Sequence, residues 1–139
     1  MRFIQICNIL LLLACVGWVK ADYDEDVQKA IKTCEVEVPV KEEEMETFLK
    51  SKMDPSTATK DIKCQGKCIF EKQGFFVKGV FDEKAFIEST LKHPALKDRQ
   101  TEVAKAVDLC KSKTGVDECE TAFIIGMCLR DNKDFVFGQ

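Results

Sequence analysis

The chain has 139 residues, 45% of them hydrophobic and 32% charged, and its 21 basic and 24 acidic side chains give a formal net charge of −3. This length suits a single domain that can bury a core. The mildly acidic balance argues against nucleic acid as a partner. No Asn-X-Ser/Thr tripeptide occurs, so N-glycosylation is not expected.

The first residues are typical of a secretory signal peptide. Arg2 supplies a positive charge, and an apolar run follows over residues 9–16. Val19 and Ala21 then stand at the −3 and −1 positions before Asp22, which is the pattern that signal peptidase cleaves. An uncleaved membrane anchor is the alternative, but the apolar run is shorter than the roughly 20 residues that span a bilayer.

We therefore predict a signal peptide at residues 1–21 and one secreted, extracellular domain at residues 22–139. The leader holds two basic residues and no acidic ones, so its removal lowers the formal charge from −3 to −5. No later stretch is apolar enough to be a membrane helix, and we expect a domain that is not embedded in a membrane.

Helical periodicity governs the first half of this domain. Apolar stripes predict helices over residues 24–34 and 41–52, separated by a proline. Asp54 followed by Pro55 indicates the start of a third helix, which we expect to end at Gly74. The inward residues are Val27, Ala30, Ile31 and Cys34 in the first helix, Met45, Phe48, Leu49 and Met53 in the second, and Ile62, Cys64, Cys68 and Ile69 in the third.

The second half continues in the same way. Residues 75–81 form an apolar loop, and Asp82 can cap a fourth helix that carries Phe86, Ile87 and Leu91 and ends at a His-Pro pair. A fifth helix, ending near Gly115, has the stripe Leu96, Val103, Val107 and Cys110. The last helix begins with the acidic residues Asp117, Glu118 and Glu120 and ends near Arg130, as its dipole favours. Its middle, residues 122–129, is apolar on every side, which is typical of a central, buried helix.

Eight cysteines occur, and six remain once the leader is removed. An even number in a small secreted domain indicates disulfides. A zinc site is the alternative, but the chain has no Cys-X-X-Cys or His-X3-His pair. Helix geometry argues against a bond between Cys64 and Cys68, or between Cys119 and Cys128, and leaves ten of the fifteen pairings open. The six are Cys34, Cys64, Cys68, Cys110, Cys119 and Cys128.

The spacing of these cysteines resembles that of the insect odorant-binding proteins, the pheromone-binding and general odorant-binding group. Three residues separate the second and third cysteines, and eight separate the fifth and sixth, over nearly the whole mature chain. The resemblance implies an all-α fold of about six helices around an internal apolar cavity, with three interlocked disulfides. It further implies the pairs Cys34–Cys68, Cys64–Cys119 and Cys110–Cys128.

The resemblance also implies a pocket for a small hydrophobic ligand. The mature chain is rich in phenylalanine and has adaptable methionines, which suit an apolar molecule. For any one of these residues, ordinary core packing is the alternative. The expected ligand-binding residues are Phe48, Leu49, Met53, Ile62, Ile69, Phe75, Phe76, Phe81, Leu91, Val103, Val107, Phe123, Ile124, Met127, Phe135 and Phe137.

For two segments of this set we expect a specific position relative to the pocket. The apolar pairs at 75–76 and 80–81 should fold over something, either the cavity mouth or the core. Phe135 or Phe137 in the tail should wall or plug the pocket, as the tail does in the family, and a frayed tail is the alternative.

His93 is the only histidine. It can end a helix or act as a pH switch for ligand release.

The sequence therefore predicts a secreted carrier and not an enzyme. A nucleophilic triad needs a base, and one helix-ending histidine is a poor candidate. We expect no cofactor and no metal, and a monomer or weak homodimer. A secreted non-sensory factor, either a carrier in haemolymph or reproductive fluid or a protein recognised by a membrane receptor, is the first alternative. A saposin-like lipid-active protein is the second, and it would need an exposed apolar face.

Overall fold

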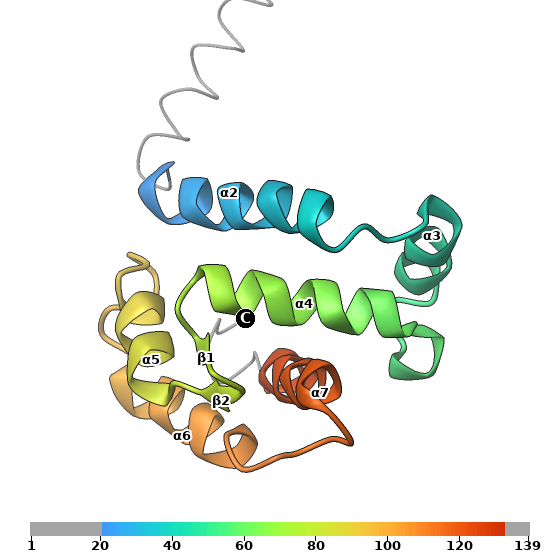
Figure 1. Cartoon of the computed structure of the whole chain (residues 1–139). Coiled ribbons are helices and arrows are strands. Elements are labelled where there is room, and N and C mark those ends of the chain that lie inside the picture. Colours follow the sequence, from blue (N-terminus) through green and yellow to red (C-terminus); the bar gives the residue numbers. More distant parts are fainter. Residues whose placement is uncertain (1–20, 133–139) are drawn as a thin grey trace, which may run out of the picture.

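The computed structural model describes residues 21–132, with side chains from Glu25 onward, and shows an all-helical fold with one small hairpin (Figure 1). Helices α4 and α7 lie side by side in the middle. Helix α2 covers one side, and α5 and α6 lie on the other. The elements are α2 Ala21–Glu37, α3 Glu42–Lys50, the 3₁₀ turn η1 Pro55–Thr57, α4 Lys60–Lys72, β1 Phe76–Val77, β2 Val80–Phe81, α5 Glu83–Leu91, α6 Gln100–Cys110 and α7 Glu118–Asp131.

Two helix starts lie where the sequence predicts them. The Asp82 carboxylate accepts a hydrogen bond from the Ala85 backbone N–H at 3.0 Å and caps α5. The Asp117 carboxylate accepts one from the Glu120 N–H at 2.8 Å and caps α7. Each bond satisfies an N–H that has no partner inside the helix, so the chain starts a helix at that residue.

The third predicted helix starts later than expected. Asp54 does act as a cap, accepting a hydrogen bond from the Ser56 N–H at 2.9 Å, but it starts only the short turn η1. The chain is extended again at Ala58, and α4 begins after Thr59, whose hydroxyl accepts from the Ile62 N–H at 3.3 Å. The prediction from Asp54 and Pro55 was wrong because a second N-cap lies five residues further on.

The fifth predicted helix is shorter at both ends. Leu96 is buried in a turn before α6, where its N–H donates to the His93 carbonyl at 2.9 Å. At the other end, α6 stops at Cys110 and not at Gly115. A Cβ at Gly115 would lie 2.7 Å from the Cβ of Glu120, so this glycine lets the connecting segment approach α7.

The apolar loop at 75–81 is an antiparallel hairpin, with Phe76 opposite Phe81 and Val77 opposite Val80. Lys78 and Gly79 both have positive φ, 51° and 80°, as the tight two-residue turn between paired strands requires. Phe76 is 2% exposed, whereas Val77 and Val80 point outward. The expectation of an irregular loop was therefore wrong.

Three disulfides hold the helices, and their pairing is the one that the resemblance implies. Cys34–Cys68 joins α2 to α4, Cys64–Cys119 joins α4 to α7, and Cys110–Cys128 joins α6 to α7. By the chain-entropy estimate each contributes about 3–4 kcal/mol. The neighbouring core contains four phenylalanine rings in mutual contact, those of Phe70, Phe75, Phe81 and Phe86.

Candidate functional site

A groove of about 490 Å³ opens along one side of α7, between α6 and the turn at Pro55. One wall is apolar and comes from α7, whose residues 123, 124 and 127 lie on the same helical face. We call this hollow the α6–α7 groove. Its lining residues are Pro55, Leu109, Lys113, Phe123, Ile124, Met127, Cys128, Asp131 and Asn132.

The α7 wall rests on a packed apolar layer. Phe123 is 8% exposed and lies in one cluster with Phe48 and Ile62, and its ring centroid is 6.2 Å from that of Phe48. Met53 and Met127 pack against the same cluster. The wall is therefore backed by core, and the unbranched side chain of Met127, which lines the groove, can adapt to different shapes.

Leu109 forms the opposite wall and is 53% exposed. Its position on α6 is away from the buried stripe of Val103, Val107 and Cys110. A large leucine side chain that faces an open hollow offers apolar area to a ligand. Sequence analysis missed it, although a leucine outside the inward stripe of an amphipathic helix is the signal that could have found it.

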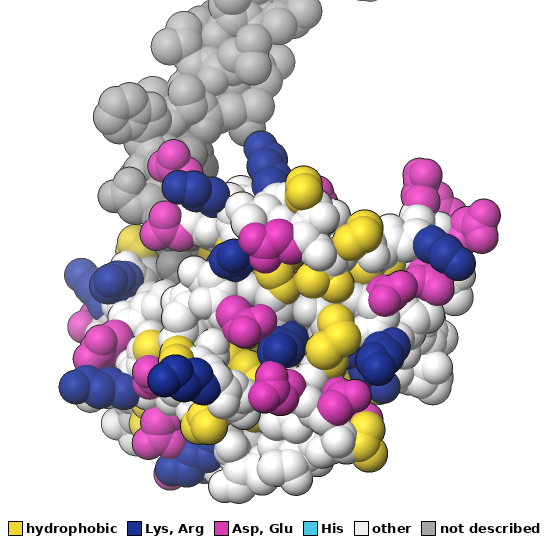
Figure 2. Space-filling model, in the orientation of Figure 1, with side chains coloured by type: hydrophobic (Ala, Val, Ile, Leu, Met, Phe, Trp, Pro, Cys, Tyr) yellow, Lys and Arg dark blue, Asp and Glu magenta, His cyan; other side chains and the backbone are white. Residues whose placement is uncertain are grey.

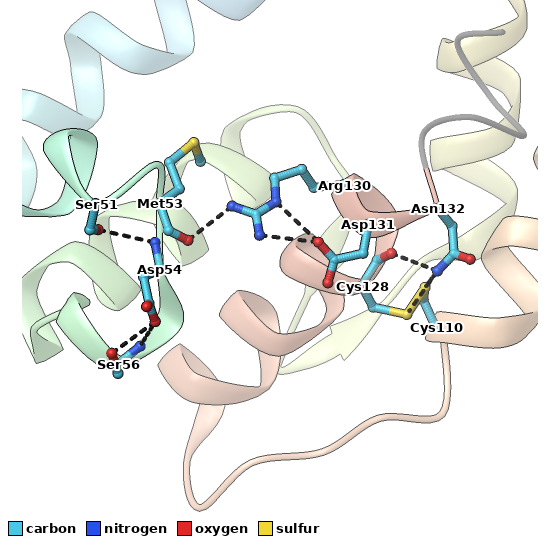
Figure 3. A network of polar contacts seen from close by, with 9 residues as sticks. All are labelled: Ser51, Met53, Asp54, Ser56, Cys110, Cys128, Arg130, Asp131 and Asn132. Atoms are coloured by element: carbon cyan, nitrogen blue, oxygen red, sulfur yellow. Dashed lines mark hydrogen bonds and ion pairs between the residues drawn. A yellow bond between two sulfur atoms is a disulfide. The ribbon is translucent and has the colours of Figure 1, made fainter. Parts of the chain in front are cut away.

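The end of the groove is polar and tightly held (Figure 3). The Asn132 amide nitrogen donates to the Cys128 carbonyl at 2.8 Å. The Arg130 guanidinium donates to the Met53 carbonyl at 2.9 Å and pairs with Asp131 at 3.1 Å. These bonds tie the turn after α3 to the end of α7, which fixes the two sides of the groove relative to each other.

The turn at Pro55 is itself ordered by Asp54. Hydrogen bonds from Ser56, first from its backbone N–H and then from its hydroxyl, lower the pKa of the Asp54 carboxyl. Ser51 adds a further bond, because its hydroxyl accepts from the Asp54 N–H at 3.1 Å. The carboxylate form is thus favoured, and it holds Pro55 at the edge of the groove.

A second and larger hollow, of about 780 Å³, lies between α2, the end of α4 and α5. It is lined mainly by polar and charged side chains, and none of the residues predicted for the ligand pocket within the described part of the chain lines it. We call it the lysine cleft. Its lining residues are Asp26, Val27, Lys29, Ala30, Thr33, Lys72, Gln73, Ser89, Lys92 and Pro94.

The predicted ligand residues are distributed over several places. Phe123, Ile124 and Met127 line the groove, and Phe48, Met53 and Ile62 lie in the layer that supports Phe123. Leu49 does not join them: it is 57% exposed, because one helical step of about 100° turns it away from Phe48.

The other predicted residues lie outside the groove. Leu91 and Val103 pack around Leu96, while Phe81 and Val107 belong to the cluster that includes Ile125 and Leu129. Phe75, just before the hairpin, and Phe76, in its first strand, are both buried, and Ile69 is half-buried on α4. Phe135 and Phe137 lie outside the described residues, so the prediction for the tail stays a prediction.

The described residues contain no group of three or more His, Cys, Asp or Glu side chains that could hold a metal ion. Across the same part of the chain, no helix has the length and apolar character needed to cross a membrane.

Comparison with known proteins gives a consistent picture. The model of the PBP/GOBP family matches residues 18–132. A solved structure of the fatty acid binding protein OBP56a from the oral disk of the blowfly Phormia regina is 34% identical, covers 81% of this chain and 93% of that chain, and superposes with a TM-score of 0.64. No curated protein sequence gives a significant match.

Two further structures share the fold. Odorant Binding Protein 4 of the predator Chrysopa pallens is 26% identical over 81% of this chain and 91% of that chain, with a TM-score of 0.64. The odorant-binding protein OBP28a of Drosophila melanogaster is 21% identical over 82% and 93%, with a TM-score of 0.63, and shows likeness of fold alone.

Proposed function

The chain belongs to the PBP/GOBP family, and from this premise we propose that it is an extracellular carrier that takes up small hydrophobic molecules in the α6–α7 groove. Members of this family are binding proteins for small ligands and not enzymes, which agrees with the sequence prediction of a non-enzyme. The carrier would bring a sparingly soluble molecule through an aqueous fluid and release it.

One observation supports this site above all. Phe123, Ile124 and Met127, predicted from the sequence, and Leu109, which was not, face one hollow of about 490 Å³. Ligand pockets typically have volumes of about 300–1,000 Å³ and apolar walls with a few polar groups. The groove combines an apolar wall with a polar end at Lys113, and so has the usual composition of such a site.

The lining also favours one ligand class. The apolar wall has no hydrogen-bonding groups, whereas Lys113, Asp131 and Asn132 can meet a single polar group at one end. A molecule with an apolar body and one hydroxyl or carboxyl group suits this arrangement. The blowfly protein at 34% identity is a fatty acid binding protein, which supports placing fatty acids and alcohols in the test panel. We expect affinities of about 1 μM, or −8.2 kcal/mol.

The proposal includes secretion, and it places the ligand in a groove and not on a broad apolar surface. Three disulfides are typical of an oxidising, extracellular environment. On the face drawn in Figure 2, acidic and basic side chains are interspersed and apolar ones occur in small groups. A lipid-active protein would instead need a broad apolar face. Recognition by a receptor and weak dimerisation remain compatible predictions.

The test uses protein secreted by insect cells that express the full chain. Mass spectrometry of the protein in the medium should give a chain that starts at Asp22 with three disulfides. Titration with a fluorescent naphthylamine probe should then saturate at one probe per chain, and some alcohols or fatty acids should displace it. An intact, disulfide-bonded protein that binds none of them would overturn the carrier proposal.

A matched pair of variants assigns the binding to the groove. Leu109→Glu puts a charge into the apolar wall at an exposed position, and should weaken probe binding about tenfold without loss of stability. Val116→Glu is the control, because Val116 is 88% exposed and does not line the groove. If both variants lose the same affinity, the probe binds exposed apolar surface and the groove assignment is wrong.

A further inference from the structure

One wall of the α6–α7 groove contains a disulfide, Cys110–Cys128, which we call the groove disulfide. Cys128 lines the groove and is half-buried, whereas Cys110 is 0% exposed and lies in the core cluster between α6 and α7. A molecule in the groove therefore meets Cys128 and not Cys110. Thiol–disulfide exchange needs this kind of access, because the attacking thiolate must reach one sulfur while the other sulfur leaves.

A hydrogen-bond donor lies beside both sulfur atoms (Figure 3). The Asn132 amide nitrogen donates to Cys128 Sγ at 3.7 Å and to Cys110 Sγ at 3.8 Å, and its shorter bond to the Cys128 carbonyl at 2.8 Å holds it in place. A thiolate accepts a hydrogen bond more strongly than a disulfide sulfur does, since it carries a full charge. Apolar surroundings disfavour a thiolate at Cys110. The Asn132 amide offsets this cost for the sulfur that leaves.

Lys113 adds a positive charge at the same end of the groove. It lines the groove, and its backbone N–H donates to the Cys110 carbonyl at 3.2 Å. A neighbouring cation favours the thiolate form of a thiol, which is the form that attacks. The acidic residue in the lining, Asp131, is paired with Arg130 at 3.1 Å. Next to the apolar wall from α7, this arrangement suits a molecule with an alkyl body and a thiol group.

The other two disulfides lack this combination of features. Cys34–Cys68 is buried at both ends, with 0% and 5% of the two residues exposed. Cys64–Cys119 is half-buried at both ends, but it lines neither the groove nor the lysine cleft. The groove disulfide also has the shortest sequence separation, 18 residues against 34 and 55. In the chain-entropy model the protein loses least stability when the bond with the shortest loop opens.

We propose that the groove disulfide is an exchange site for apolar thiols, which the groove first binds and then holds covalently. This rests on the proposed function, because the groove must bind the apolar body of the thiol. The ligand thiolate attacks Cys128 Sγ and forms a new S–S bond as the bond to Cys110 breaks. Cys110 leaves with the electron pair, accepts the Asn132 hydrogen bond and takes up a proton from water. The reverse attack by the Cys110 thiolate on Cys128 expels the thiol and restores the original disulfide.

The test compares hexanethiol with glutathione, a polar thiol, on the secreted and fully oxidised protein. After a timed reaction, N-ethylmaleimide blocks the free thiols, and peptide mass spectrometry locates each adduct. Hexanethiol should add to Cys128 and leave Cys110 to be blocked. Cys64–Cys119 is the internal reference, because it is half-buried and lies outside the groove. Relative to this reference, hexanethiol should favour the groove disulfide about tenfold more than glutathione does.

Variants separate binding of the thiol from the exchange step. Leu109→Glu should raise the hexanethiol concentration needed for half-maximal rate about tenfold, and the exposed control Val116→Glu should not. Asn132→Asp replaces the amide donor with a carboxylate that repels a thiolate. It should lower the maximal rate of addition to Cys128 about fivefold and leave the half-maximal concentration unchanged. A residue that only supported the fold would change both disulfides alike.

The outcomes also separate this proposal from the carrier proposal. If dodecanol displaces the probe but hexanethiol shows no preference for the groove disulfide over Cys64–Cys119, the exchange site is wrong and the carrier proposal stands. If neither the probe nor dodecanol binds while hexanethiol still adds selectively to Cys128, the exchange site stands without a general carrier. An unchanged maximal rate in Asn132→Asp would overturn the route in which Asn132 stabilises the leaving sulfur.

Discussion

The α6–α7 groove and the lysine cleft differ in how their walls are made. The groove draws most of its wall from one helix, α7, and is apolar along its length and polar at one end. The cleft takes half of its lining from α2 and the rest from the end of α4, from α5 and from the turn after α5, and it is mostly polar. A wall made by one helix leaves a periodic pattern in the sequence, whereas a wall assembled from several elements does not. This explains why sequence analysis found part of the groove and none of the cleft.

The two hollows also differ in how they are held. Cys110–Cys128 joins the two helices of the groove, and Cys128 lines it. The cleft has its disulfide, Cys34–Cys68, between α2 and α4 and outside its lining. A polar bond supports each hollow as well: Arg130 to the Met53 carbonyl beside the groove, and Lys72 to Glu37 beside the cleft. Matched variants of the two disulfides, and of the two polar bonds, therefore test the difference between the groove and the cleft.

The largest effect is expected from the disulfides. Cys110→Ser with Cys128→Ser should lower the free energy of unfolding by about 3 kcal/mol, and Cys34→Ser with Cys68→Ser by about 0.5 kcal/mol more, since the sequence separations are 18 and 34 residues. Only the first pair should also weaken probe binding in the groove. Urea unfolding and probe titration of the folded fraction measure the two quantities.

If both double cysteine variants reduce probe affinity equally, the predicted difference between the groove and the cleft is wrong. In that case the groove would depend on the overall fold and not on the local bond between α6 and α7. If a double variant is not secreted in folded form, Leu109→Glu and its Val116→Glu control still test the groove, because both positions are exposed.

Much of the fold could be predicted because it depends on local signals. Asp82 and Asp117 are N-caps whose chemistry is complete within four residues, and they start α5 and α7 as predicted. At Asp54 the local signal was ambiguous, because Thr59 provides a competing cap. The disulfide pairing followed from the family resemblance, since helix geometry alone left ten arrangements open.

The site was less predictable because exposure depends on tertiary contacts. Phe123, Ile124 and Met127 were expected to line a pocket, but periodicity could not separate them from core residues such as Val103 and Val107. Leu109 was missed because its helical position faces solvent until α7 and Pro55 complete the groove. Sequence analysis singled out neither Lys29 nor Lys92, because only the packing of α2 near α5 makes them neighbours of one cleft.

A smaller effect is expected from the polar bond beside the groove. Arg130→Gln removes a charge-assisted bond to the Met53 carbonyl, 77 residues away in sequence, from a side chain that is about one-third exposed. We expect a loss of about 1 kcal/mol in unfolding free energy, less than for a fully buried bond of this kind. Because the turn at Pro55 then loosens, probe affinity should fall as well. A loss of stability with unchanged probe affinity would show that Arg130 does not shape the groove.

The smallest effect is expected from the ion pair beside the cleft. Lys72 and Glu37 are both about half exposed, so water and salt screen their attraction, and Lys72→Gln should lower the unfolding free energy by no more than about 0.5 kcal/mol. This difference from the wild type should shrink further at high salt, whereas the difference caused by Arg130→Gln should persist, since part of that bond is a hydrogen bond to a carbonyl. Urea unfolding of both variants at low and high salt checks this. If Lys72→Gln lowers the unfolding free energy as much as Arg130→Gln does, and if this loss does not depend on salt, the cleft is held as firmly as the groove. The distinction between a rigid apolar site and an adaptable charged one is then wrong.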